Sequence, residues 1–222
     1  MGLRWIHIPN LEKEKIEAGF MPRGPDLGYS RKKAVVFVVD VTRSMGHQIT
    51  KLIQSIEDAA DKKYPEVVLG LVTFGATTHG WEIKKHQWTD KDFTNDSSVI
   101  GERLKEFEKT TGGGIFVPSV EALVIGCSLQ WPEEYKNRVV VLFTDSPPFT
   151  NSLSNEVIES AMSSAKISRF CVVSVTGERD IREPYWELIQ FMMGQTEGLM
   201  LDIDRFDSSK GLMFLRPDPH LS

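Results

Sequence analysis

The chain has 222 residues, of which 41% are hydrophobic and 26% are charged, a balance typical of a globular protein with a sizeable core. The formal net charge of −5 disfavours a nucleic-acid partner, because non-specific binding to phosphates needs a basic surface. No apolar run approaches the roughly 20 residues that span a bilayer, and the first residues do not have the pattern of a signal peptide. These features predict a cytoplasmic protein with no membrane partner.

The distribution of proline and glycine predicts one regular domain between two irregular ends. Residues 1–33 are polar and broken by prolines and glycines, so we interpret them as an N-terminal extension. Residues 34–205 are predicted to form the domain, and 206–222, with two prolines, an irregular tail. The only cysteines, Cys127 and Cys171, lie in apolar segments and are expected to be buried and reduced.

Apolar runs alternate with helical stripes along the whole domain. Continuous apolar runs, typical of strands buried on both faces, occupy residues 34–39, 67–74, 138–144, 170–175 and 199–203. A more polar segment, 79–88, suits an exposed edge strand. Apolar residues at helical spacing predict helices at about 49–60, 98–109, 120–127, 157–165 and 184–192, and Pro118 suits the first turn of the third. The alternation predicts an α/β fold: a doubly wound, mostly parallel sheet in the order 3-2-1-4-5-6, with one antiparallel edge strand and helices on both faces.

Oxygen-bearing side chains follow two of the predicted central strands. Asp40, Thr42 and Ser44 come after the first strand, and Asp145 follows the strand at 138–144. Ligands of open α/β sheets bind at the carboxyl ends of the strands, and hard cations prefer oxygen ligands. We therefore expect these four side chains to converge on a Mg²⁺ site. In the alternative interpretation, the residues after the first strand merely cap the following helix.

The same residues resemble the metal-ion-dependent adhesion site of the von Willebrand factor A (vWA) family. Asp40, Thr42 and Ser44 match its Asp-x-Ser/Thr-x-Ser signature, a Gly-Gly-Gly loop follows at 112–114, and Asp145 matches the distal aspartate. The resemblance covers roughly residues 34–203. It implies a three-layer fold, a bound Mg²⁺ (or Mn²⁺ or Ca²⁺), and a protein partner that presents Asp or Glu.

Two positions depart from the family pattern. Arg43 replaces a small residue, and Ile115 stands where a threonine or an aspartate is usual. Thr111 and Ser119 are the nearest hydroxyls to that loop, and Thr111 is taken as the fifth candidate ligand. The departures leave open a complete site, a weaker one, and a degenerate one used for direct protein contact.

An enzymatic alternative uses the same ion. Asp40 and Asp145 could flank a metal in a phosphoester hydrolase, although Thr42 occupies the position where one such class carries a second acid. The sequence contains no phosphate-binding Gly-rich motif with lysine and no nucleophile elbow. The five histidines lack metal-ligand spacing and are interpreted as surface residues. Trp81 and Trp88 are interpreted mainly as packing residues. We therefore predict a non-enzymatic binding module.

Overall fold

A computed structural model describes residues 32–61, 66–77, 80–107, 117–146, 153–174 and 196–206. Within these ranges the chain forms a six-stranded sheet in the order β3-β2-β1-β4-β5-β6. The predicted order is confirmed, with the edge strand third along the chain. The predicted helix at 184–192, residues 1–31 and residues 207–222 lie outside the described residues.

The sheet is parallel except at one edge. The central strand β1 (Lys33–Asp40) pairs in parallel with β2 (Val67–Thr77) and with β4 (Asn137–Phe143). Strands β5 (Arg169–Ser174) and β6 (Glu197–Asp202) extend the parallel sheet, whereas β3 (Gly80–Lys85) is antiparallel to β2. All eight residues of β1 are buried, which explains its unbroken apolar run.

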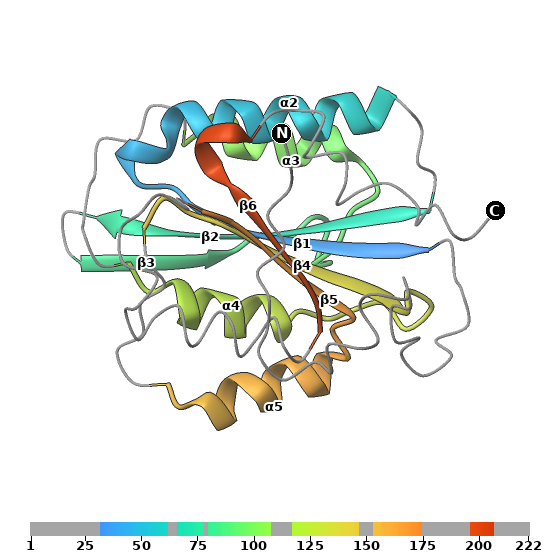
Figure 1. The fold of residues 1–222 in the computed structure, drawn as a ribbon. Helices are drawn as coiled ribbons and strands as arrows, with labels where there is room; N and C mark the ends of the chain where they lie inside the picture. The colour runs from blue at the N-terminus through green and yellow to red at the C-terminus, as the bar shows by residue number, and fades with distance from the viewer. Residues whose placement is uncertain are drawn as a thin grey trace, which may run out of the picture.

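Helices cover both faces of the sheet, as Figure 1 shows. A short 3-10 turn, η1 (Arg43–Met45), leads into α2 (Gly46–Asp61), which lies with α3 (Ser97–Lys105) on one face. Helices α4 (Ser119–Cys127) and α5 (Asn155–Ala165) lie on the other face, and the 3-10 turn η2 (Ile203–Arg205) follows β6.

Alternate residues of β1 enter two separate cores. Val35, Phe37 and Val39 belong to the core beneath α2, whereas Val36 and Val38 belong to the core beneath α4. This division follows from the twofold side-chain period of a strand. The sheet therefore separates the two apolar clusters and is held from both sides.

The element boundaries differ from the predicted ones by a few residues. Pro118 is the residue before α4 rather than part of its first turn, and α3 ends at Lys105. Phe206, assigned to the irregular tail, is buried and packs edge-to-face on Phe143 at a centroid distance of 5.1 Å. Both cysteines are buried thiols outside any disulfide, as predicted, and burial raises the pKa of Cys127 to about 12. No helix in the described ranges is long and apolar enough to cross a membrane.

Candidate metal-binding site at the carboxyl edge of the sheet

Asp40 is a fully buried carboxylate at the end of the central strand. Its Oδ1 accepts a hydrogen bond from the backbone N–H of Thr42 at 2.9 Å. Its Oδ2 accepts one from the hydroxyl of Thr144 at 2.7 Å. Parallel pairing of Val39 with Phe143 brings Thr144, the next residue after β4, beside Asp40. Pairing between β1 and β4 therefore orients this carboxylate.

The electrostatic surroundings of Asp40 disfavour its charged form. Burial raises its pKa from 3.8 to about 6, and repulsion from Asp145 adds to the rise, although hydrogen bonds from Thr144 and Thr42 oppose it. None of the ion pairs among the described residues includes Asp40. At neutral pH this carboxylate thus carries a buried negative charge that no lysine or arginine of the described chain neutralises.

Thr42, the residue before η1, and Ser44, within η1, place two hydroxyls close together. Their oxygens are 3.3 Å apart; Thr42 is buried and Ser44 is exposed. Neighbouring ligands of an octahedral Mg²⁺ shell with bonds near 2.1 Å are about 3 Å apart, so both oxygens fit one shell. The side chain of Thr42 makes no capping hydrogen bond, which disfavours the helix-cap interpretation for this hydroxyl.

Asp145 supplies the second carboxylate, half-buried after β4. Its Oδ1 accepts a hydrogen bond from the Ser146 hydroxyl at 3.3 Å, and the Ser146 backbone N–H donates to the Thr144 hydroxyl at 3.1 Å. Its electrostatic effect on Asp40 places the two acids in one neighbourhood. Thr144 was not among the predicted site residues, although its position between an apolar run and Asp145 was a usable signal.

Not every predicted site residue can be placed. Thr111, the Gly112–Gly114 loop and Ile115 lie outside the described residues. Across the described ranges, no three or more His, Cys, Asp or Glu side chains gather where they could bind a metal ion. The group described at the carboxyl edge consists instead of two carboxylates and two hydroxyls.

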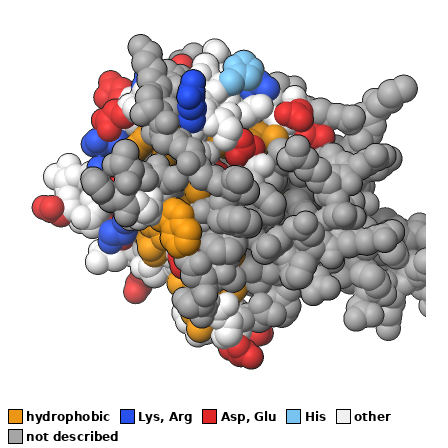
Figure 2. All heavy atoms as spheres, turned by 90° about the vertical axis from the view of Figure 1, so that its left-hand side faces the viewer, with side chains coloured by type: hydrophobic (Ala, Val, Ile, Leu, Met, Phe, Trp, Pro, Cys, Tyr) orange, Lys and Arg blue, Asp and Glu red, His pale blue; other side chains and the backbone are white. Residues whose placement is uncertain are grey.

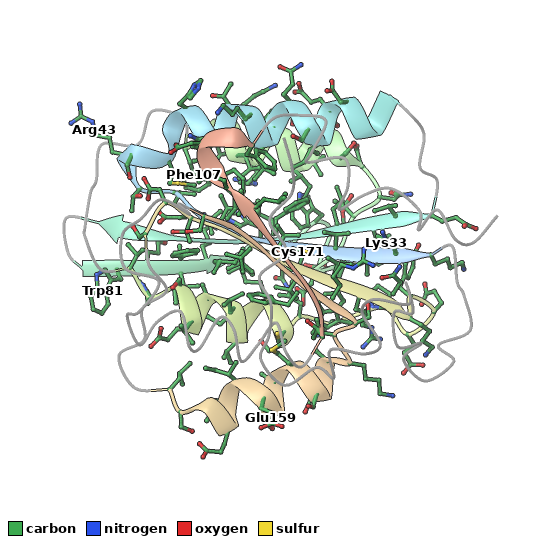
Figure 3. The ribbon with its side chains drawn as sticks, viewed as in Figure 1. Lys33, Arg43, Trp81, Phe107, Glu159 and Cys171 are labelled. Atoms are coloured by element: carbon green, nitrogen blue, oxygen red, sulfur yellow. The ribbon has the colours of Figure 1, made fainter. Side chains whose placement is uncertain are left out.

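The carboxyl edge also carries exposed basic and aromatic side chains. Arg43 and Trp81 both lie at this end of the sheet, and Arg43 points away from the ribbon (Figure 3). Trp81 is 48% exposed, whereas Trp88 packs on the core beneath α2 as interpreted. Viewed onto this edge, acidic and basic side chains surround a small hydrophobic patch in the described part of the face (Figure 2).

One histidine corrects the sequence interpretation. His86 was interpreted as a surface residue, but it is buried, with its Nε2 2.9 Å from the Thr73 hydroxyl and its ring edge-on to Phe107. Burial lowers its pKa to about 4, and the positive charge of Lys84 contributes. His86 is therefore neutral at physiological pH and belongs to the packing of the β3 edge.

A second buried carboxylate, Asp92, was not singled out from the sequence. Lys85 Nζ lies 3.1 Å from its Oδ1, and Gln87 Nε2 donates to the same oxygen at 2.9 Å. The backbone N–H of Gln130 donates to Oδ2 at 2.8 Å. Burial favours a higher pKa for Asp92, but these donors together hold it below the usual value. The carboxylate joins the loop after β3 to the loop after α4.

Comparison with known proteins shows the fold but no family. No protein-family model matches the chain, and no curated protein matches it. Among solved structures, the pilus adhesin SpaC of Lactobacillus rhamnosus GG is similar over 84% of this chain and 30% of its own, at 13% identity and a TM-score of 0.50. Proximal thread matrix protein 1 of the mussel byssus is similar over 83% and 46%, at 12% identity and a TM-score of 0.51. The chain thus corresponds to less than half of each protein.

Proposed function

We propose that this chain is a metal-dependent protein-binding module with a vWA-type three-layer fold. The proposed ion is Mg²⁺, with Mn²⁺ or Ca²⁺ as substitutes, and the partner supplies an Asp or Glu carboxylate to it. The described candidate ligands are the two carboxylates and two hydroxyls of the carboxyl edge: Asp40, Thr42, Ser44 and Asp145. Thr111, outside the described residues, is the fifth candidate. The ion when bound offers a Lewis-acidic position for an anionic group.

The observation that carries this proposal is the unneutralised charge of Asp40. A buried carboxylate is stable when a cation or several donors compensate its lost hydration. Asp40 has only neutral donors, from Thr42 and Thr144, and a second acid nearby, so its ionised form is unfavourable without a cation. A divalent ion among these oxygens would make the local electrostatic potential positive and would favour the ionised form of both carboxylates.

The fold comparisons agree with a binding role only in a general way. Proteins that share the fold include, by their names, a pilus adhesin and a thread matrix protein. At 12–13% identity this likeness concerns the fold alone. The proposal therefore depends on the side chains at the carboxyl edge.

The geometry favours binding over phosphoester hydrolysis. The side chain of Asp40 has no exposed surface, and both of its oxygens accept hydrogen bonds from within the protein. A nucleophilic or basic carboxylate must instead reach its substrate within hydrogen-bond distance. Asp40 is therefore better placed to hold an ion than to attack a phosphorus atom.

The test combines metal binding, partner capture and turnover. Wild type and Asp40→Asn are compared by pull-down from cell extract with Mg²⁺ and with chelator, and by hydrolysis of p-nitrophenyl phosphate. We expect specific partners that present an acidic segment, captured by wild type with Mg²⁺ only, and no turnover. Capture that is indifferent both to chelator and to Asp40→Asn would support a degenerate site. Turnover that needs Mg²⁺ and disappears in the variant would support the hydrolase.

A further inference from the structure

We propose that Arg43 makes the site selective for partners with two neighbouring acidic groups, one for the ion and one for the Arg43 guanidinium. This inference depends on the proposed metal-dependent function and adds a specificity residue to it. Arg43 lies on the η1 turn between Thr42 and Ser44, so the residues on both sides of it are candidate ligands.

The Arg43 side chain has no structural task among the described residues. It is exposed, and it forms no hydrogen bond or ion pair with another described side chain. Several other basic side chains of the described chain form ion pairs: Lys85 with Asp92, Arg103 with Glu106, and Lys105 with Glu57. In Figure 3 the Arg43 side chain points away from the ribbon at the end of the molecule where β2 ends and β3 begins.

The charge of Arg43 is of the wrong sign to help a metal ion bind by itself. A guanidinium near a cation site repels the cation, and exposure to solvent keeps that repulsion small. The same charge favours an anion that approaches the ion from outside. Arg43 also does not neutralise Asp40, since that carboxylate is buried and forms no ion pair in the described chain. Its favourable interaction is therefore with the partner.

The chemistry of the guanidinium specifies what the partner carries. Arginine binds a carboxylate through two parallel N–H donors, which fixes orientation as well as charge. If the partner has a single carboxylate and it binds the ion, the two parallel N–H donors of the guanidinium fork have no acceptor from the partner. A peptide with two adjacent acidic residues can occupy both the ion and the fork, so the fitting occupant is a diacidic segment of a protein.

The experiment uses the full chain loaded with Mn²⁺, whose paramagnetism broadens the proton resonances of any bound peptide. The probes are a capped pentapeptide with one glutamate and the same pentapeptide with two adjacent glutamates. In wild type we expect the diacidic peptide to bind about tenfold more tightly, the effect of one good charge-assisted contact. In Arg43→Ser the ratio falls to about twofold, which the second glutamate contributes statistically, while Mn²⁺ alone binds as well or slightly better.

Two further variants and three outcomes make the test decisive. Lys136→Ser removes an exposed positive charge beside the start of β4, at the opposite end of the sheet, and should keep the wild-type ratio. Arg43→Lys keeps the charge without the fork and should give an intermediate ratio. Equal ratios in wild type and Arg43→Ser, or loss of Mn²⁺ binding in Arg43→Ser, would overturn the inference about Arg43 alone. No Mn²⁺-dependent binding of either peptide to wild type would contradict the proposed function as well.

Discussion

The negative charges of two buried aspartates in this protein are compensated to different extents. Asp92, beside the β3 edge, has a lysine, a glutamine and a backbone N–H around it, and its pKa lies below the usual value. Asp40, at the carboxyl end of β1, has only the neutral donors of Thr42 and Thr144 and a neighbouring acid, and its pKa rises to about 6. Both side chains have almost no exposed surface, but Asp40 lies deeper in the protein, so the depth of burial and the donors around each carboxylate together explain the difference in pKa.

Asp92 and Asp40 represent two kinds of buried carboxylate, which differ in how far the protein compensates the negative charge. The charge of Asp92 is compensated inside the protein, so it stabilises the fold whenever it is ionised. The charge of Asp40 is compensated only in part, so ionisation in the absence of metal works against the fold. The same type of side chain thus has a structural role at one edge and is the proposed metal ligand at the other.

The largest expected effect on folding is at Asp92. Asp92→Asn removes the negative charge that holds Lys85 and accepts from the Gln130 backbone, so we expect a loss of about 3 kcal/mol in the free energy of unfolding. Urea unfolding at pH 7 measures it. A loss below about 0.5 kcal/mol would show that the Asp92 network is not structural.

The matched substitution at Asp40 should have the opposite sign. Asp40→Asn removes the cost of ionising a carboxylate whose pKa is raised from 3.8 to about 6, which is about 3 kcal/mol at pH 7. The amide also loses one acceptor oxygen, which offsets about 1 kcal/mol, so the metal-free variant should be more stable by about 2 kcal/mol. The measurement is urea unfolding in the presence of chelator. Destabilisation of the metal-free protein by this change would mean that Asp40 is as well compensated as Asp92.

The pH dependence of stability sharpens the contrast. The pKa of His86 falls from 6.5 to about 4 on folding, because the folded state favours the neutral imidazole. The stability that depends on neutral His86 is therefore complete above pH 6.5 and is lost as the pH falls toward 4. The slope reaches at most about 1.4 kcal/mol per pH unit. Asp40 acts oppositely between pH 6 and 3.8, because the folded state takes up its proton first. In metal-free protein the slope should be shallower in His86→Gln and steeper in Asp40→Asn than in wild type; equal slopes in all three would contradict these assignments.

The smallest effect is expected at Thr144, which positions Asp40. Thr144→Val removes the 2.7 Å hydrogen bond to Oδ2 while preserving the side-chain shape. Loss of an outer-shell partner weakens metal binding by roughly tenfold or more, and we expect the lower end here. Isothermal titration with Mg²⁺ provides the measurement. Thr196→Val, which removes the hydrogen bond from the Phe170 backbone N–H at the opposite edge of the sheet, is the matched control. An unchanged affinity would show that the bond does not organise the metal site.

The strand order and the proximity of Asp40 to Asp145 could be predicted from the sequence because both depend on local patterns. Runs such as 34–39 and 139–143 are apolar without interruption, since the strands that contain them are covered on both faces. Residues that follow such strands lie at one edge of a parallel sheet, which indicated that Asp40 and Asp145 are neighbours.

The compensation of each charge could not be predicted, because it depends on contacts between distant segments. The bond from Thr144 to Asp40 joins residues 104 positions apart, and the bond from Gln130 to Asp92 joins residues 38 apart. The burial of His86 depends on Phe107, which packs on it from beyond α3. The polar character of residues 79–88 indicated an exposed edge strand but contained no information about the packing of Phe107 on His86.

Titration of wild type and Asp40→Asn with Mg²⁺ at pH 7 tests the central claim most directly. We predict millimolar or tighter binding to wild type that raises its thermal midpoint, and no detectable binding to Asp40→Asn. Asp92→Asn, which removes a buried carboxylate elsewhere, should bind Mg²⁺ like wild type. Equal Mg²⁺ binding by wild type and Asp40→Asn, or none by either, would contradict the proposal that a bound metal ion neutralises the charge of Asp40.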